Sequence, residues 1–327
     1  MIKYIIKRIL LMIPVLLGVI IVIFSINYFS PSDPITTLVG AEATEEQRQA
    51  KAEELGLDKP YFVQLGNYIY GVVRGDLGTS YQTKNSVTQN ILERFPKTLL
   101  LAVFAVAFAT IIGIPLGVIA ATKQNTIFDY VCTFLALIGA SVPSFWLGLM
   151  LIIAFSLNLG WFPASGLETA ISWVLPVISI GVFPIAQIMR TTRSSMLEVI
   201  RQDYIRTARS KGISENKVIT RHALKNALIP VITVVGMQLS FVMGGVIVLE
   251  AVFNIPGLGS LLKIAIGTND YPTIEGIVLF TAIVMSVMNL IVDIIYAYID
   301  PRLKSQYTSK KKKKEIALTE AASSSEA

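Results

Sequence analysis

The chain has 327 residues, of which 53% are hydrophobic and 15% charged, and its mean hydropathy is +0.63. Long apolar runs produce this value, which excludes an ordinary soluble domain and indicates an integral membrane protein. The net charge of +6 does not indicate nucleic-acid binding, because the basic residues lie in loops between the apolar runs, and the single cysteine, Cys132, excludes an intrachain disulfide.

The first predicted element is a transmembrane helix within residues 1–30. Lys3, Lys7 and Arg8 precede an apolar run from Ile9 to about Phe29. This run is longer than the core of a signal peptide, and no cleavage pattern of small residues follows it. Because basic residues accumulate on the cytoplasmic side of a membrane, the N-terminus is expected in the cytoplasm.

Residues 31–97 form the longest polar stretch, in which acidic residues slightly outnumber basic ones. Capping-box patterns predict two helices there: Thr44-x-x-Gln47 begins one that Gly56 ends, and Ser86-x-x-Gln89 begins another. Pro60 is expected to begin a further helix between them. We therefore expect an ordered helical region on the external side.

Five further spans are predicted within residues 98–299, in the apolar runs Thr98–Thr122, Tyr130–Asn158, Ile171–Met189, Val231–Leu249 and Ile277–Ile299. The run at 130–158 exceeds the roughly 20 residues that a bilayer core requires, so tilt or a bend near Pro143 is expected. Pro176 and Pro184 are expected to break the next span. Residues 250–275 are expected outside the membrane, with a turn at residues 254–259.

The distribution of charge gives the topology. Six spans place both termini, the turn at Lys123 and the loop 190–230 on one side, and the basic residues concentrate on that side. The expected fold class is therefore an all-α integral membrane protein with six transmembrane helices and cytoplasmic termini. Residues 300–327 are expected to form a disordered basic tail, whose lysines either contact anionic lipid or serve only topology and solubility.

The segment 204–230 is polar and basic between two apolar spans. Its small residues Thr207, Ala208 and Gly212 precede a predicted turn, Ser214 is expected to cap a second helix with its hydroxyl, and Pro230 lacks the N–H of an interior helical position. A helix–turn–helix outside the bilayer is predicted. Two interpretations remain open: a solvated loop whose charges only orient the chain, or a docking element for a soluble partner.

This segment resembles the "EAA" loop of ABC-type import permeases. Arg206-Thr207-Ala208 with Gly212 fits that frame, and the late Leu228-Ile229-Pro230 ending resembles the oligopeptide, dipeptide and nickel branch. Further resemblance to this branch lies in the segments Gly75–Tyr81, Arg94–Leu99, Leu249–Phe253, Pro256–Gly259 and Asp300–Arg302. The chain is similar to the first-type permease subunit of bacterial peptide importers over almost its whole length.

The resemblance implies the type I ABC importer permease fold in the bacterial cytoplasmic membrane. It also implies four partners besides membrane lipid: a second homologous permease, two ABC ATPase subunits and an extracytoplasmic peptide-binding lipoprotein. The residues implied to dock the ATPase are Tyr204, Arg206, Thr207, Ala208, Gly212, Ser214 and Pro230. Peptide is the implied cargo, with nickel or another small solute as the alternative.

The chain carries no signature of an energy source of its own. No G-x-x-x-x-G-K-[ST] pattern occurs, so ATP and Mg²⁺ are expected on partner subunits, and no catalytic, cofactor or metal residue is predicted. His222, the single histidine, is expected to pack or hydrogen-bond rather than to bind a metal. Asp293 is either half of a local ion pair or a proton site. An ion-coupled transporter and a membrane scaffold or sensor remain the alternative classes.

Overall fold

The computed structural model describes residues 2–40 and 42–299. These residues form helices and irregular segments, and their only strand-like feature is an isolated bridge between Thr79 and Ser86, which confirms the all-α class. The basic tail and the Asp300–Arg302 motif lie outside the described residues. The α-helices are α1 Ile2–Tyr28, α2 Pro34–Val39, α3 Glu45–Leu55, α4 Tyr61–Val73, α5 Val87–Thr122, α6 Ile127–Ser141, α7 Ser144–Leu151, α8 Val174–Ile200, α9 Asp203–Ser210, α10 Glu215–Lys217, α11 Leu224–Val252, α12 Leu258–Gly267 and α13 Tyr271–Ile299.

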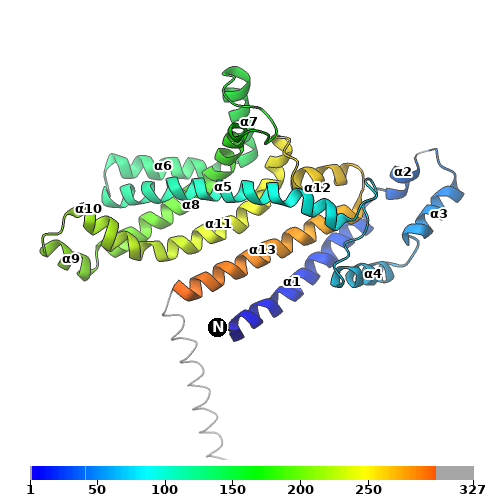
Figure 1. Cartoon of the computed structure of the whole chain (residues 1–327), viewed down its shortest axis with the longest axis horizontal. Coiled ribbons are helices and arrows are strands. Elements are labelled where there is room, and N and C mark those ends of the chain that lie inside the picture. Colours follow the sequence, from blue (N-terminus) through cyan, green and yellow to red (C-terminus); the bar gives the residue numbers. More distant parts are fainter. Residues whose placement is uncertain (1, 41, 300–327) are drawn as a thin grey trace, which may run out of the picture.

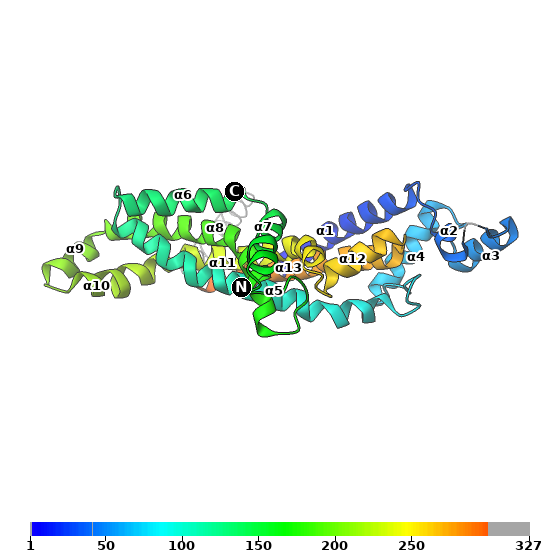
Figure 2. The same cartoon turned by 90° about the horizontal axis from the view of Figure 1, so that it is seen from above.

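The molecule is elongated. Helices α9 and α10 lie at one end and α2–α4 at the other, with the long helices running between them (Figures 1 and 2). Helix α5 packs mainly against α8, α11 contacts α5, α8 and α13, and α1 lies along α13. Five described helical stretches are long and apolar enough to cross a membrane, and a bent pair provides a sixth if it is counted as one span.

The bent pair replaces the expected span at residues 130–158. Helix α6 ends at Ser141. Helix α7 continues into a π-helix at Ile152–Asn158, and this combined stretch lies at 100° to α6. Figure 1 shows α7 standing away from the long helices. Val142 is extended, with φ −84° and ψ 123°, because a residue before proline disfavours the helical conformation. The expected bend at Pro143 is therefore a sharp turn between two short helices.

Helix α5 is one 36-residue helix, so the expectation of a separate external helix followed by a span from Thr98 was wrong. Pro96 lies inside it, at a cost of about 3 kcal/mol in an exposed helix. Val87 and Ile91 are almost fully buried against Leu258, Leu261 and Ile277, which offsets that cost. Ser86 occupies the N-cap position, but its side chain makes no capping hydrogen bond.

Helix α8 also continues beyond its predicted end. It passes Met189 and runs to Ile200, so Arg190 and Arg193 lie within the helix. Pro184 does not break it, and Pro176 lies in its first turn, where no intrahelical N–H is required. Close packing supports α8, since a Cβ added at Gly117 of α5 would lie 2.5 Å from Thr192 Cβ.

The α2–α4 region is ordered as predicted. Thr44 and Gln47 form both hydrogen bonds of the capping box, Gly56 ends α3 in the left-handed conformation, and α4 follows Pro60. Within residues 250–275, α11 ends at Val252, a turn follows as predicted, and the rest forms α12 and the beginning of α13. Glu250 is fully buried, and its carboxylate accepts hydrogen bonds from Thr98 Oγ1 and from the backbone N–H of Gly259, both at 2.5 Å.

Candidate functional site

The basic segment forms a hairpin that joins α8 to α11. Its first leg is α9, its turn spans residues 211–214, and its second leg begins with α10. The second leg is not a separate helix, because residues 215–252 form one helical stretch that passes through a π-helical segment at 218–223. Figure 1 shows the hairpin projecting at the tip of the molecule. The predicted helix–turn–helix is confirmed, and its second helix continues directly into a span.

Pro230 lies inside α11 rather than at its end. It removes the N–H that would bond the Asn226 carbonyl. Its neighbours Ala227 and Val231 are fully buried, and the Ser195 hydroxyl donates to the Ala227 carbonyl at 2.9 Å. This contact with α8 stabilises the helix around the proline.

The base of the hairpin is an apolar cluster. Ile205 and Ala208 of α9 are buried against side chains from α5, α8 and the second leg: Ala121, Met196, Val218, Ile219, Ala223 and Ala227. Ala208 is therefore a packing residue rather than an exposed contact. Tyr204 adds a polar link, since its hydroxyl accepts a hydrogen bond from Asn226 Nδ2 at 2.8 Å. The hairpin is packed onto the long helices as an ordered element.

The turn favours glycine because of its backbone conformation. Gly212 has φ +74°, in the left-handed region, although a Cβ there would meet no heavy atom within 4 Å. Arg209 bridges the turn with two hydrogen bonds to Glu215, Nη2 to Oε1 at 2.7 Å and Nε to Oε2 at 3.1 Å. The hydrogen bond with Glu215 raises the pKa of Arg209. Ser214 occupies the N-cap position but makes no side-chain capping bond, so the expected capping by its hydroxyl was wrong.

The outer face of the hairpin is exposed and cationic. Tyr204 and Thr207 are exposed, and the side chain of Arg206 is 81% accessible, with Asp203 as a distant ion-pair partner at 3.9 Å. The structure thus brings Tyr204, Arg206, Thr207 and Gly212 together on one protruding element. It places Ala208 beneath them and Pro230 away from them on α11.

Sequence reasoning missed the polar contacts that stabilise the hairpin and the helices beside it. Asp129 of α6 pairs with Arg193 of α8 close to the hairpin, and Ser195 and Asn226 contribute the hydrogen bonds described above. An acid at the beginning of an apolar run was the one available signal for Asp129. Its partner is far away in the chain, so only the packing of α6 against α8 identifies it.

Comparisons with known proteins cover nearly the whole chain. Residues 113–305 match the family described as binding-protein-dependent transport system inner membrane component, and residues 1–102 match the N-terminal family of such membrane components. The chain is 44% identical to the dipeptide transport system permease protein DppB of Alkalihalophilus pseudofirmus, over 93% of this chain and 100% of the relative. It is 41% identical to the oligopeptide transport system permease protein AppB of Bacillus subtilis, over 93% of this chain and 100% of the relative.

Solved structures agree in fold. A chain of the MetNI methionine ABC transporter in an inward-facing conformation superposes with a TM-score of 0.54 at 20% identity, covering 64% of this chain and 96% of that chain. A chain of an amino acid ABC transporter gives a TM-score of 0.50 at 16% identity, covering 66% of this chain and 94% of that chain. At these identities the likeness shows the fold alone.

Proposed function

This chain belongs to the family of binding-protein-dependent transport system inner membrane components, and we propose from that membership that it is the permease subunit of an ATP-driven importer of dipeptides or oligopeptides. The names of relatives at 40–44% identity, which include dipeptide and oligopeptide permeases, support peptide as the cargo. Nickel or another small solute is the alternative cargo for the same architecture.

In this proposal the chain sits in the bacterial cytoplasmic membrane with the hairpin and both termini in the cytoplasm. Residues 1–30 form the N-terminal end and first span, 31–97 the external helical region, 98–299 the transmembrane core and 300–327 the basic tail. A second homologous permease completes the pathway, and an extracytoplasmic peptide-binding lipoprotein delivers the cargo. ATP and Mg²⁺ are bound by two ATPase subunits, so this chain is not itself an enzyme.

The observation that carries the proposal is the continuity of the hairpin with two spans. An ATPase seated on the exposed face of α9 moves an element whose buried base also includes residues of α5, α8 and the second leg. Because lipid provides no hydrophobic force between helices, the spans can exchange packings where small residues meet. Gly236 of α11 provides such a close approach on one side, since an added Cβ would lie 2.5 Å from Val292 Cγ2 of α13.

The test is uptake of a labelled dipeptide by liposomes. The complete complex contains both permeases, both ATPases and the receptor. It is expected to accumulate the dipeptide only when ATP is present on the side of the membrane where the ATPase subunits lie. Omitting the ATPase subunits is expected to abolish uptake. Accumulation driven by a proton or sodium gradient without ATP contradicts the proposal and identifies a secondary transporter. ATPase binding without transport of any of the offered solutes identifies a scaffold.

A further inference from the structure

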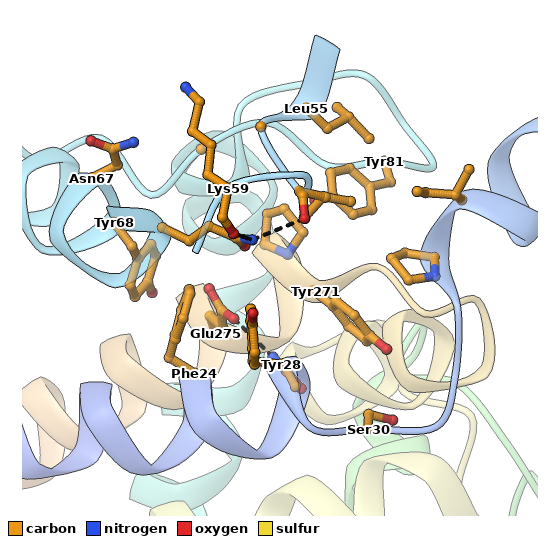
Figure 3. Close-up of a pocket in the computed structure, with 18 of the residues that line it drawn as sticks. Phe24, Tyr28, Ser30, Leu55, Lys59, Asn67, Tyr68, Tyr81, Tyr271 and Glu275 are labelled. Atoms are coloured by element: carbon orange, nitrogen blue, oxygen red, sulfur yellow. Dashed lines mark hydrogen bonds between the residues drawn. The ribbon is translucent and has the colours of Figure 1, made fainter. Parts of the chain in front are cut away.

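A cavity of about 740 Å³ lies at the end of the molecule opposite the hairpin. It is bounded by the ends of α1 and α13 and by the α2–α4 region (Figure 3). Its volume falls within the roughly 300–1,000 Å³ of ordinary small-molecule sites. The cavity is thus large enough for a small organic ligand.

A buried carboxylate lines this cavity. Glu275 of α13 is 7% exposed, and its Oε1 accepts a hydrogen bond from Asn27 Nδ2 at 3.0 Å. None of the ion pairs found in residues 2–40 and 42–299 includes Glu275. A buried carboxylate is stabilised most effectively by a cation that forms hydrogen bonds with it. Its charge is therefore complementary to a cationic ligand.

Aromatic rings surround the same end of the cavity. Figure 3 shows Phe24, Tyr28 and Tyr68 grouped near Glu275. The Phe24 ring stacks with Tyr68 at 6.1 Å and with Tyr28 at 6.3 Å between centroids. Aromatic faces attract ammonium groups through their quadrupoles. A carboxylate beside several rings is a favourable environment for such a group.

The cavity lining also contains a hydroxyl without a hydrogen-bond partner in the part of the chain that the structure describes. The Tyr68 hydroxyl oxygen is buried and has no hydrogen-bond partner among the described residues. Burial, followed by the charge of Glu275, raises the pKa of Tyr68, so the hydroxyl stays protonated and can donate. It is suited to an acceptor, such as a carbonyl oxygen, on the same ligand.

We propose that this cavity binds a primary ammonium group carried by a small aromatic or apolar molecule. Glu275 accepts the hydrogen bonds of the ammonium, and the rings of Phe24, Tyr28 and Tyr68 enclose it. Two sources have this chemistry: the N-terminus of a short peptide and a free amine. The site requires neither ATP nor transport, so it stands or falls separately from the function proposed above.

The test is calorimetric titration of the purified full-length chain in lipid nanodiscs with three probes. Phenylalanyl-alanine amide carries the ammonium, its N-acetyl derivative lacks it, and phenethylamine carries it without a peptide bond. The free dipeptide amide is expected to bind at least about tenfold more tightly than the acetylated form. Equal binding of the phenethylamine supports the site and identifies free amines as its ligands, whereas weaker binding identifies peptide N-termini.

Variants separate the cavity from other contacts. Glu275→Gln keeps the side-chain shape and is expected to weaken ammonium binding by about tenfold or more. Tyr68→Phe removes only the hydroxyl and is expected to weaken binding of the dipeptide amide by about threefold to tenfold, which provides a test even if Glu275→Gln fails to fold. The control is Glu93→Gln on the exposed side of α5, where binding is expected to stay unchanged. Equal affinity for the acetylated probe, or wild-type affinity in folded Glu275→Gln, overturns the proposal.

Discussion

Arg193 donates two hydrogen bonds to Asp129, Nε to Oδ1 at 2.6 Å and Nη2 to Oδ2 at 2.7 Å, and so joins α8 to α6. The Asp129 side chain is 3% exposed and that of Arg193 29%. Asp129 also accepts the backbone N–H of Asn125 at 3.1 Å, in the turn between α5 and α6. One carboxylate therefore joins α6 to α8 and to the turn that follows α5.

The variant Asp129→Asn is expected to destabilise the chain. It leaves the partly buried Arg193 without its carboxylate, at a cost of roughly 1.5–3 kcal/mol. The measurement is the midpoint of thermal unfolding in detergent. Arg206→Gln is the control, because that side chain is 81% exposed and its acidic partner lies 3.9 Å away. Equal midpoints for the two variants contradict a structural role of the Asp129 pair.

Substitution of Gly212 is expected to uncouple ATP hydrolysis from uptake. Valine in the left-handed conformation costs about 1–2 kcal/mol, which lowers the population of the native turn by a factor of about 5–30. Gly212→Asn serves as the matched variant, since asparagine tolerates positive φ. The expected order of dipeptide uptake is wild type, then asparagine, then valine, with membrane insertion unchanged. Full uptake by Gly212→Val refutes a role for this turn in coupling.

Substitution by alanine is expected to change stability in opposite directions at Gly259 and at Gly244. A Cβ at Gly259 would clash with the Ile247 carbonyl oxygen, so Gly259→Ala forces the backbone apart, at a cost of about 1–3 kcal/mol or more. A Cβ added at Gly244 would meet no heavy atom within 4 Å apart from the backbone of its own helix, and alanine is expected to stabilise α11 by about 0.5–1 kcal/mol. Thermal unfolding of the two variants in parallel measures the difference. A stable Gly259→Ala protein argues against this close approach of α12 to α11.

Asp293 pairs with Arg8 of α1 at 2.9 Å, as the interpretation of a local ion pair predicts. Asp293→Asn is therefore expected to retain ATP-driven uptake. The measurement is the initial uptake rate across a range of external pH, with Arg8→Gln as the matched change on the other side of the pair. Loss of uptake in Asp293→Asn alone, with a changed pH profile, indicates a proton-carrying role instead.

Hydrophobic patterning predicted the spans because burial in lipid depends on composition, which a single sequence displays. Local signals also succeeded where the whole interaction is local: the Thr44 capping box closes within four residues, and the turn at Gly212 depends on one backbone conformation. The elbow between α9 and α10 was therefore predictable before any packing was known.

Element boundaries were less predictable, because distant partners decide them. Pro184 was expected to break a span and a new span was expected to begin at Thr98, yet packing against α12, α13 and α5 keeps Pro184 and Pro96 inside long helices. At Pro143 the proline does end a helix, because Val142 before it is extended and α6 stops there. The burial of Glu250 depends on Thr98, a partner 152 residues away, and no local pattern indicates it.

The length of α5 has a mechanical consequence. Its 36 residues span about 54 Å, well beyond the roughly 30 Å of a bilayer's hydrocarbon core. Near its start, Val87 and Ile91 are packed against α12 and α13, and near its end Ala121 belongs to the hairpin base. One continuous helix thus connects the two aqueous faces of the protein, so a displacement at one face is transmitted to the other.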